Sequence, residues 1–319
     1  MKAQTYLKVL FFILAVLIAS AVGYVVYFAT HYPLPITSRI SFDAKLKFVR
    51  DKIDVNKIDT IIVGSSIGLN DIQGTYLEKN SKKCQAVLNL SVYEATTLES
   101  EQLLELRQAF PHLKRMIYSV QYSDTPHTYT YDNFDAKVLS GYMAKTLDPL
   151  SYLKVVFDAS KNIVFLYQRQ EMWKQKHMQN NSFHYLGFDS SGSVPLHIYG
   201  KDIIQHRWKN PQPNIQHPKS FEAIDRIAKK AQEEGLYFYI AHQPYRAPLV
   251  KKYKRVKAAI HDFDTRVDRI FSKYSHAKLV RLQLLHLNDD YFADRSHLND
   301  KGSIETAKAM ATFIDKNEK

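Results

Sequence analysis

Residues 58–63 read IDTIIV and are followed at once by Gly64, Ser65 and Ser66. A short run of mostly β-branched residues predicts a strand that is buried on both faces. Four more strands are predicted from similar runs, at residues 86–90, 116–120, 236–241 and 278–282. Amphipathic helical patterns lie between and after these runs, at residues 221–231, 253–271 and 301–316. Strands that alternate with helices predict an α/β fold built on a parallel sheet.

The N-terminal segment is long and apolar enough to cross a membrane. Residues 9–29 carry no charged side chain and follow Lys2 and Lys8. About 20 apolar residues span a bilayer as a helix, whereas the apolar core of a cleavable signal peptide has roughly 7–15. We therefore expect an uncleaved anchor, which Pro33 and Pro35 end before a short juxtamembrane link. The alternative is a signal peptide, because residues 19–21 (ASA) have the composition of a cleavage site.

The flanks of this segment predict its orientation. An aromatic belt at the membrane surface is predicted at Tyr24, Tyr27, His31 and Tyr32. The two N-terminal lysines favour a cytoplasmic N-terminus. We expect residues 1–34 to form a cytoplasmic tip and transmembrane anchor, and residues 35–319 to form one extracytoplasmic domain. The protein would then be a single-pass protein of the cytoplasmic (inner) membrane, with the lipid bilayer as a partner.

The composition excludes several classes of protein. Of the 319 residues, 45% are hydrophobic and 24% are charged, so a sizeable core is possible and wholesale disorder is excluded. The net charge is +12, but no nucleic-acid motif accompanies it, and we expect no nucleic-acid partner. The basic runs fit either solvated helix faces or attraction to an anionic lipid or polymer. Cys84 is the single cysteine, so no disulfide forms within the chain, and no Cys/His cluster has metal-ligand spacing.

One long segment departs from the alternation of strands and helices. Residues 122–218 are rich in Tyr, His, Asn and Ser, with helical patterns at 136–145 and 150–168 and an irregular loop or hairpin at 183–195. An insertion between the third and fourth strands would lie over the carboxyl ends of the strands, where open α/β sheets bind ligands. It is the expected source of substrate specificity, and the alternative is a lid or packing excursion without ligand contact.

Two short motifs carry the chemistry. Ser66 follows a strand and a glycine, and a serine at such a strand-to-helix turn presents its hydroxyl at the edge of the sheet. Asp294 and His297 lie three residues apart in a loop before the last helix. The carboxylate can hold the imidazole in the tautomer that accepts a proton from a serine. Taken alone, each motif also fits an ordinary turn. Together, in an α/β chain, they predict a Ser-His-Asp triad.

The same residues resemble the SGNH/GDSL hydrolase superfamily. The resemblance rests on Ser66 after the first strand and on Asp294, His297, Leu298, Asn299 and Gly302 before a terminal helix. It is closest to a membrane-anchored branch similar to the D-alanyl-lipoteichoic acid biosynthesis protein DltD and to alginate O-acetylation proteins. It covers most of residues 55–125 and 236–315 and leaves the insertion uncovered.

The resemblance implies a three-layer α/β/α, flavodoxin-like fold with a parallel sheet. It also implies acyl-ester chemistry with Ser66 as nucleophile, His297 as base and Asp294 as the group that orients it, without a cofactor or metal. The expected oxyanion and substrate-binding residues are Gly64, Ser65, Val92, Gln121, Ser123, His242 and Tyr245. The chain departs from the family pattern here. It has no glycine after the second strand, and Ser123 stands where an asparagine is usual.

We therefore expect a membrane-anchored esterase or O-acyltransferase that acts on acyl esters of extracytoplasmic cell-surface polysaccharide or a related polymer. The choice between hydrolysis and transfer stays open. A multi-spanning membrane acyltransferase is a candidate partner. One alternative is a catalytically inactive glycan-binding or assembly subunit, which the unusual oxyanion region favours. A lipase that acts on membrane lipids is a third possibility, and the polar insertion speaks against it.

Overall fold

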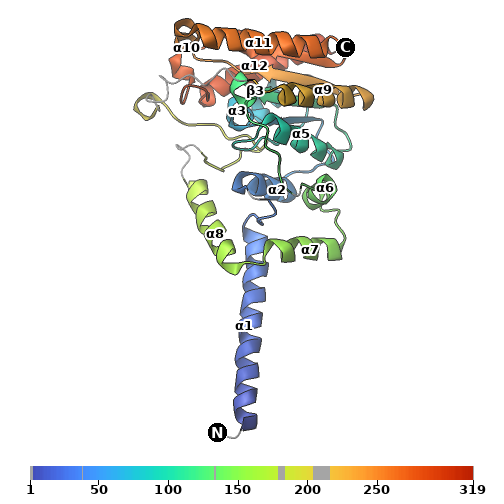
Figure 1. Cartoon of the computed structure of the whole chain (residues 1–319), viewed down its shortest axis with the longest axis vertical. Coiled ribbons are helices and arrows are strands. Elements are labelled where there is room, and N and C mark those ends of the chain that lie inside the picture. Colours follow the sequence, from blue (N-terminus) through green and yellow to red (C-terminus); the bar gives the residue numbers. More distant parts are fainter. Residues whose placement is uncertain (1–2, 38, 133, 179–183, 204–215, 319) are drawn as a thin grey trace.

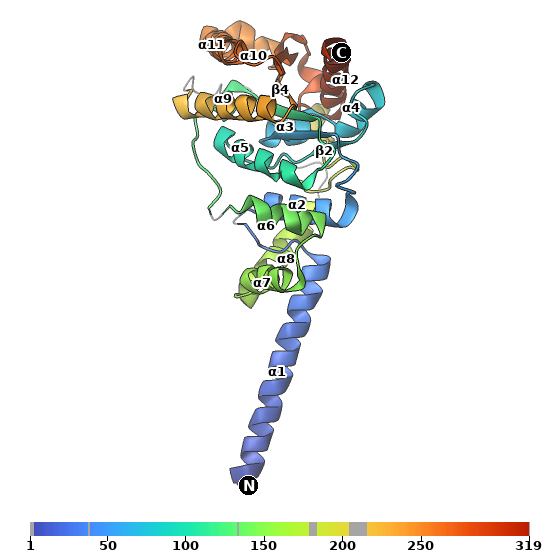
Figure 2. The same cartoon turned by 90° about the vertical axis from the view of Figure 1, so that its right-hand side faces the viewer.

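The computed structural model describes the whole chain except residues 1–2, 38, 133, 179–183, 204–215 and 319. A single helix, α1 (Ala3–His31), projects from an α/β body (Figures 1 and 2). Its apolar window has no residue buried against the protein, and α1 is long and apolar enough to span a membrane or to serve as a signal sequence. Lys2 and Phe183, which the sequence interpretation used, lie outside the described residues.

The body is built on a parallel sheet of five strands. The strands are β1 (Thr60–Gly64), β2 (Val87–Asn89), β3 (Arg115–Val120), β4 (Tyr237–His242) and β5 (Ala277–Arg281). Their order across the sheet is β2-β1-β3-β4-β5, and every neighbouring pair is parallel. This is a doubly-wound order: β2 lies on one side of β1, and β3, β4 and β5 follow one another on the other side. The predicted α/β fold with a parallel sheet is confirmed, and each predicted strand is found within two residues of its expected position.

Helices cover both faces of the sheet. One face packs against α5 (Thr97–Glu105), α9 (Pro218–Glu233) and α11 (Lys254–Phe271). The opposite face packs against α4 (Gly74–Asn80) and α12 (Asp300–Asn317). Strand residues point alternately to the two faces, so Ile61 lies in the first core and Ile62 in the second. Burial on both faces explains why the strands are continuous apolar runs.

The remaining elements lie at the ends of the strands or in the inserted segment. They are α2 (Ile40–Lys52), α3 (Ser66–Asp71), η1 (Leu106–Ala109), η2 (Tyr122–Asp124), α6 (Ala136–Ala144), α7 (Pro149–Ala159), α8 (Ile163–Met178), η3 (Gly200–Asp202), α10 (Ala247–Lys252), η5 (Leu282–Leu284) and η6 (Asp289–Tyr291). Figure 1 shows α7 and α8 at the upper end of α1, far from the C-terminus.

One predicted element is wrong, and one helix was not predicted. The helix predicted at residues 150–168 is two helices, α7 and α8, because the Asn162 side chain accepts the Phe165 N–H (3.0 Å) and starts a new helix. A short juxtamembrane link was expected after Pro35, with no helix before the first strand, yet α2 begins at Ile40. Its apolar residues Phe42, Leu46 and Val49 are buried at helical spacing and join the main core.

The inserted segment divides into parts with different positions. Residues of η2 and those just after it stay at the sheet edge, whereas α7 and α8 turn toward α1 (Figure 2). The stretch after α8 then returns to the sheet as a loop, where the Ser191 carbonyl accepts the Asn89 N–H (2.7 Å) beyond the end of β2. Within it, Val194 donates to the Leu69 carbonyl of α3 (2.9 Å), and Leu196 accepts from Asp300 at the start of α12 (3.0 Å). The loop therefore supports α3, which carries Ser66, and the start of α12, which directly follows the loop that carries His297.

The residue that follows α6 has a left-handed backbone conformation, and substitutions there test whether that conformation is strained. Lys145 follows the helix with a φ of 59°, a conformation that costs a residue with a Cβ roughly 1–2 kcal/mol and glycine almost nothing. We expect Lys145→Gly to raise the free energy of unfolding by about 0.5–1 kcal/mol. Lys145→Ala keeps the strained backbone and should be close to neutral, so chemical denaturation of the two variants separates backbone strain from loss of the lysine. A Gly variant no more stable than the Ala variant would contradict this explanation.

Candidate active site

The candidate residues gather at the carboxyl edge of the sheet. Ser66 follows β1, Ser123 and Asp124 follow β3, and His297 lies in the loop between β5 and α12. Because all strands are parallel, their carboxyl ends meet at one edge, where loops from distant parts of the chain come together. Ser66 and His297 are separated by 231 positions in the sequence, and their side chains are in hydrogen-bond contact.

A sharp turn between β1 and α3 presents Ser66. Gly64 ends the strand with a φ of 156°, and a Cβ at this position would lie 2.3 Å from the Ser119 carbonyl oxygen of β3. No side chain fits there, so the glycine is required by the close approach of the two strands. Ser65 caps the following helix by accepting the Ile67 N–H (3.1 Å), and Ser66 becomes the first residue of α3.

His297 bridges Ser66 and Asp294. The distance between His297 Nε2 and Ser66 Oγ is 2.8 Å, and the distance between His297 Nδ1 and Asp294 Oδ1 is 3.0 Å. The Asp294 carboxylate also accepts the N–H groups of Ser296 and His297, each at 2.8 Å. In this arrangement, the imidazole that donates to Asp294 through Nδ1 presents Nε2 as an acceptor to the serine hydroxyl. A hydroxyl so placed can lose its proton to the imidazole as it attacks an electrophile.

The electrostatics of this pair favour a charged imidazole. Burial opposes the charge on His297, but the Asp294 carboxylate and its hydrogen bond outweigh burial and raise the pKa of His297 above 6.5. Burial alone would raise the pKa of Asp294, whereas His297 and the backbone N–H donors hold that pKa well below its usual range. Asp294 is therefore ionised throughout the neutral range and stabilises the imidazolium that would form during proton transfer.

Two further side chains hold the loop that carries His297. Asp71, the last residue of α3, accepts the Leu298 N–H at 2.9 Å through Oδ1. Gln121, after β3, donates through its amide nitrogen to the carbonyls of Pro244 (2.7 Å) and Ser296 (3.1 Å). Asp71 thus links the short helix that bears Ser66 to the loop that bears His297. Its carboxyl is fully buried, and burial raises its pKa well above the ordinary value, against the opposing effect of His297.

Asp124 is a site residue that the sequence interpretation passed over. Its Oδ1 accepts the Ser65 hydroxyl (2.9 Å) and its Oδ2 accepts the Gln121 N–H (2.8 Å). Burial raises the pKa of Asp124 to about 6, with the Gln121 N–H opposing that effect. The signal that could have identified it is its place directly after a parallel strand, beside the predicted Ser123. Asp71 had no comparable signal, because its role depends on a contact 227 positions away.

A cavity of about 400 Å³ opens in front of Ser66 and His297. Its lining is mostly polar and charged, and it includes Arg39, Thr96, Ser123, Asp124, His127 and Arg295. Tyr129 adds an exposed aromatic ring at the same cavity. His127 and Tyr129 come from the inserted segment, so part of that segment does line the site. A polar cavity with an aromatic rim suits a ligand that carries several hydroxyl groups.

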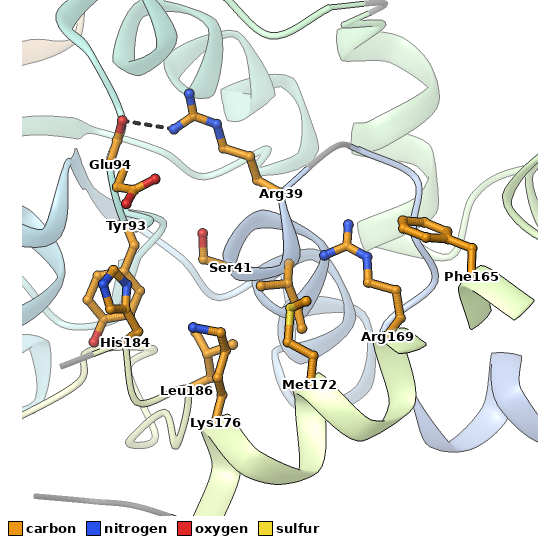
Figure 3. A pocket seen from close by; sticks show the side chains of 11 residues that line it. Arg39, Ser41, Tyr93, Glu94, Phe165, Arg169, Met172, Lys176, His184 and Leu186 are labelled. Carbon is orange, nitrogen blue, oxygen red and sulfur yellow. Dashed lines mark hydrogen bonds between the residues drawn. The ribbon is translucent and has the colours of Figure 1, made fainter. Parts of the chain in front are cut away.

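A second cavity of about 380 Å³ adjoins the first and shares Arg39 and Glu94 with it. Figure 3 shows Arg169, Met172 and Lys176 of α8 reaching into this cavity, opposite Tyr93 and His184. Arg39 donates to the Glu94 carbonyl (2.8 Å) and pairs with Glu99 (2.8 Å), which fixes it at the border between the cavities (Figure 3).

Glu94 has a φ of 63°, in the left-handed region. Such a conformation is uncommon for a residue with a side chain and often occurs at functional sites. The residue that occupies a glycine-like backbone conformation after β2 is therefore Glu94, although the sequence has no glycine there.

Two of the expected oxyanion donors already donate hydrogen bonds to backbone carbonyls of the protein. The Val92 N–H donates to the Gly64 carbonyl (3.2 Å), and both N–H groups of the Gln121 amide donate to backbone carbonyls. Ser65 and Ser123 do line the cavity, and the Ser66 N–H lies in the first turn of α3, where a helix leaves its N–H groups without internal partners. The remaining predicted donors are the Ser66 backbone and the Ser123 hydroxyl.

His242 and Tyr245 do not line this cavity. The His242 side chain is fully buried, with Nδ1 2.6 Å from Asp264 and Nε2 2.8 Å from the Tyr245 hydroxyl. The Tyr245 hydroxyl accepts the Tyr122 N–H (2.8 Å), so the pair supports the backbone at the start of η2. The expectation that both residues contact substrate is corrected: they were placed by their position after β4, and burial between β4 and α11 decides their role.

The structure shows an α/β protein whose sheet edge carries a hydrogen-bonded serine, histidine and aspartate. Within the described residues, no group of three or more His, Cys, Asp or Glu side chains could hold a metal ion. No family model matches the chain, and no curated protein matches it. The solved structures to which the chain is similar include one from Streptococcus pneumonia, described as a candidate platelet activating factor. The two share 11% identity over 86% of this chain and 92% of that one, with a TM-score of 0.43, a likeness that carries no functional argument.

The pH dependence of ester turnover tests the charge environment of His297. A base must be neutral to accept a proton, so kcat/KM should rise with pH as His297 loses its proton. The negative charge of Asp124 helps to keep that proton bound. We therefore expect Asp124→Asn to move the acid limb of the profile to lower pH and to make it steeper, because Asp124 itself no longer titrates there. An acid limb that stays in place or moves to higher pH would contradict the assignment.

Proposed function

We propose that the protein is a membrane-anchored serine esterase or O-acyltransferase of the SGNH type. The single observation that carries the proposal is the continuous hydrogen-bonded array from Ser66 through His297 to Asp294, with distances of 2.8 and 3.0 Å. The array opens into a polar cavity at the carboxyl edge of a parallel sheet. The resemblance of the same residues to the SGNH/GDSL superfamily supports the same chemistry.

The first half-reaction forms an acyl-enzyme. Ser66 Oγ attacks the acyl carbonyl carbon while His297 Nε2 takes the hydroxyl proton, and Asp294 stabilises the resulting imidazolium. The carbonyl π electrons move onto oxygen, where the Ser66 N–H and the Ser123 hydroxyl are the proposed donors. Collapse of the tetrahedral intermediate expels the alkoxide of the ester, which receives the proton from His297. The alcohol leaves, and the acyl group stays on Ser66.

The second half-reaction moves the acyl group to an acceptor hydroxyl. His297 now takes a proton from water or from a sugar hydroxyl, and the resulting oxygen nucleophile attacks the acyl-enzyme. The new ester or the free acid leaves, and the proton returns to Ser66. Transfer requires that the acceptor competes with water, which is favoured when a cavity holds the acceptor in place. The second cavity, joined to the first at Arg39 and Glu94, is the proposed site for the acceptor polymer.

The proposed substrate class is an acylated extracytoplasmic polysaccharide or related polymer. The first cavity has a mostly polar and charged lining, and the second combines charged side chains with the apolar Ile40, Phe165, Met172 and Leu186. Tyr129 and His184 supply exposed rings that suit stacking of a sugar. An apolar tunnel of the kind that holds a long acyl chain is not formed by these residues. The location outside the cytoplasm follows from the proposed role of α1 as an uncleaved anchor, with the two N-terminal lysines on the cytoplasmic side.

The test is covalent labelling of the full-length chain with a fluorophosphonate probe in detergent or nanodiscs. The probe phosphonylates a base-activated serine, whose oxygen displaces fluoride from phosphorus, so we expect one modified peptide, the one that contains Ser66. Ser66→Ala and His297→Ala should both lose labelling, while Ser275→Ala, which removes an exposed serine far from the site, should keep it. Surface-polymer acylation in cells that carry the same variants then identifies the substrate. Correctly folded wild-type protein that does not label would overturn the proposal.

The geometry also supports a second candidate, a catalytically inactive glycan-binding or assembly subunit. The observation in its favour is that the Val92 N–H and the Gln121 side-chain amide donate to backbone carbonyls of the protein. Loss of one oxyanion donor can lower the rate by about a hundredfold or more. This candidate predicts binding of the polymer that is unchanged in Ser66→Ala, together with no probe labelling of the wild type.

A further inference from the structure

Helix α7 has apolar side chains on two opposite faces. Tyr152, Val155 and Val156 pack toward the main core. Leu150, Leu153 and Phe157 lie at positions i, i+3 and i+7 of the same helix and form the other face, with exposed fractions of 78%, 59% and 69%. A surface helix of a water-soluble domain normally places polar residues on its outer face. The outer face of α7 departs from this pattern, because apolar side chains occupy it.

The apolar surface continues into the first turns of α8. Ile163, Val164 and Tyr167 are also exposed, and only residues 160–162 separate them from α7. We call these six side chains (Leu150, Leu153, Phe157, Ile163, Val164 and Tyr167) the α7–α8 surface. Single exposed apolar residues are common on proteins, but a contiguous group of this kind marks an interaction site.

The position of α8 against α1 places this surface at a defined height. The Tyr24 hydroxyl of α1 donates to the Gln170 side chain of α8 at 3.0 Å. At about 1.5 Å per residue, the charge-free stretch of residues 9–29 is about 30 Å long, which matches the thickness of a hydrocarbon core. If this stretch spans the membrane, Tyr24 lies about 8 Å inside the outer end of the span, and the contact with Gln170 holds α8 at that height. Figures 1 and 2 both show α7 and α8 at this end of α1, with α7 lying across the axis of α1.

The charges around the surface do not provide an alternative explanation. Lys154 and Lys161 both pair with Asp158, at 2.5 and 2.8 Å, and Lys174 pairs with Glu171 at 2.8 Å. These five side chains together carry a net charge of only +1, which gives the surface little attraction for an anionic partner. Its contact energy must come from apolar burial, which any lipid headgroup composition can satisfy.

We propose that the α7–α8 surface is immersed in the outer leaflet of the bilayer that α1 spans, so that the protein is held at two places and keeps a fixed orientation above the membrane. The occupant of this surface is lipid. The inference rests on α1 acting as a membrane anchor and is independent of the chemistry proposed for Ser66. It gives a role to the α7–α8 surface, none of whose six side chains lines either of the two cavities.

The test uses nitroxide labels on the full-length chain in nanodiscs of zwitterionic phosphatidylcholine. Cys84 is buried and is the single cysteine, so cysteines introduced at Leu153 and Phe157 can be labelled selectively. Accessibility is measured by power saturation with oxygen, which concentrates in lipid, and with a nickel chelate, which stays in water. We expect labels at both positions to favour oxygen severalfold over the nickel complex, as a lipid-facing label does.

Two controls make the result interpretable. A label at Val16, in the exposed middle of α1, should favour oxygen strongly and shows whether α1 is in the bilayer. A label at Lys257 on α11, at the opposite end of the body, should favour the nickel complex. Addition of anionic phosphatidylglycerol should leave the values at Leu153 and Phe157 unchanged, because the nearby lysines are already paired.

Two outcomes would overturn the inference. If the Val16 label reports lipid while the labels at Leu153 and Phe157 behave like the one at Lys257, the surface faces water. If the Leu153 and Phe157 labels are shielded from both reagents, a protein surface such as a second copy covers them instead of lipid. Exclusion of the Val16 label from lipid would overturn the premise that α1 is an anchor, without touching the proposed esterase chemistry.

Discussion

Replacement of Asp294 by asparagine is expected to lower kcat for an acyl ester by about 10⁴-fold, with little change in KM. Asparagine keeps the volume of the side chain and one acceptor oxygen, but it removes the negative charge that stabilises the His297 imidazolium. The Asp294 carboxylate accepts three N–H groups at 2.8–3.0 Å, so the surrounding loop is built for a negative charge. Initial rates with a soluble nitrophenyl ester measure the effect.

The control is the same substitution at Asp290, four residues earlier in the same loop. Its exposed side chain lies outside the cavity, and Asp290→Asn should retain the wild-type rate. Ser66→Ala and the double variant Ser66→Ala with His297→Ala should be equally inactive, because the three side chains act as one unit and their losses do not add. A fall of less than about tenfold in Asp294→Asn would argue against a catalytic role for this array.

Removal of the Glu318 side chain is expected to lower the free energy of unfolding by about 3–5 kcal/mol. Glu318 accepts from Arg115 Nε at 2.7 Å and from the Tyr239 hydroxyl at 2.7 Å, and both its own side chain and that of Arg115 are almost fully buried. The residue after α12 thus ties this helix to β3 and β4. Glu318→Ala removes the hydrogen-bonded carboxylate from a buried guanidinium and leaves it with the Asp59 carboxylate at 3.9 Å, which is far more costly than loss of an exposed ion pair.

A matched surface pair provides the comparison. Glu305 and Lys308 also lie on α12, 2.8 Å apart, but more than two-fifths of each side chain is exposed. Glu305→Ala should change stability by no more than about 1 kcal/mol. Chemical or thermal denaturation followed by circular dichroism measures both variants. Equal effects at the two positions would mean that burial of the Arg115–Glu318 pair is not what makes it stabilising.

Much of the fold could be predicted because its signals are local. The run at residues 58–63 predicts a strand because β-branched side chains suit a strand that is buried on both faces. The helix α1 ends two residues before Pro33, because proline has no backbone N–H to donate to the preceding turn. The failures are also local in origin. The break between α7 and α8 depends on the Asn162 side chain, which accepts the Phe165 N–H and so caps a new helix where a continuous helix was predicted. The helix α2 was passed over although its apolar spacing is helical.

The candidate site was predictable in part. Ser66, Asp294 and His297 could be grouped because a turn after the first strand and a loop before the last helix meet at one edge of a parallel sheet. The oxyanion donors could not be assigned in the same way. Gln121 occupies the expected position after β3, but its amide is aimed at the Pro244 and Ser296 carbonyls. Position after a strand predicts nearness to the site and not the direction of a hydrogen bond.

The sequence by itself determined the apolar N-terminal helix, the alternation of strands and helices, and the residue types that meet at the sheet edge. These features depend on neighbours a few positions apart, whose spacing is visible in the chain. Only the tertiary structure decided the contacts of Asp71 and Asp124, the burial of His242, and the exposed apolar face of α7. Each depends on which groups from distant segments compete for one donor or cover one surface, and that competition is resolved only when the chain is folded.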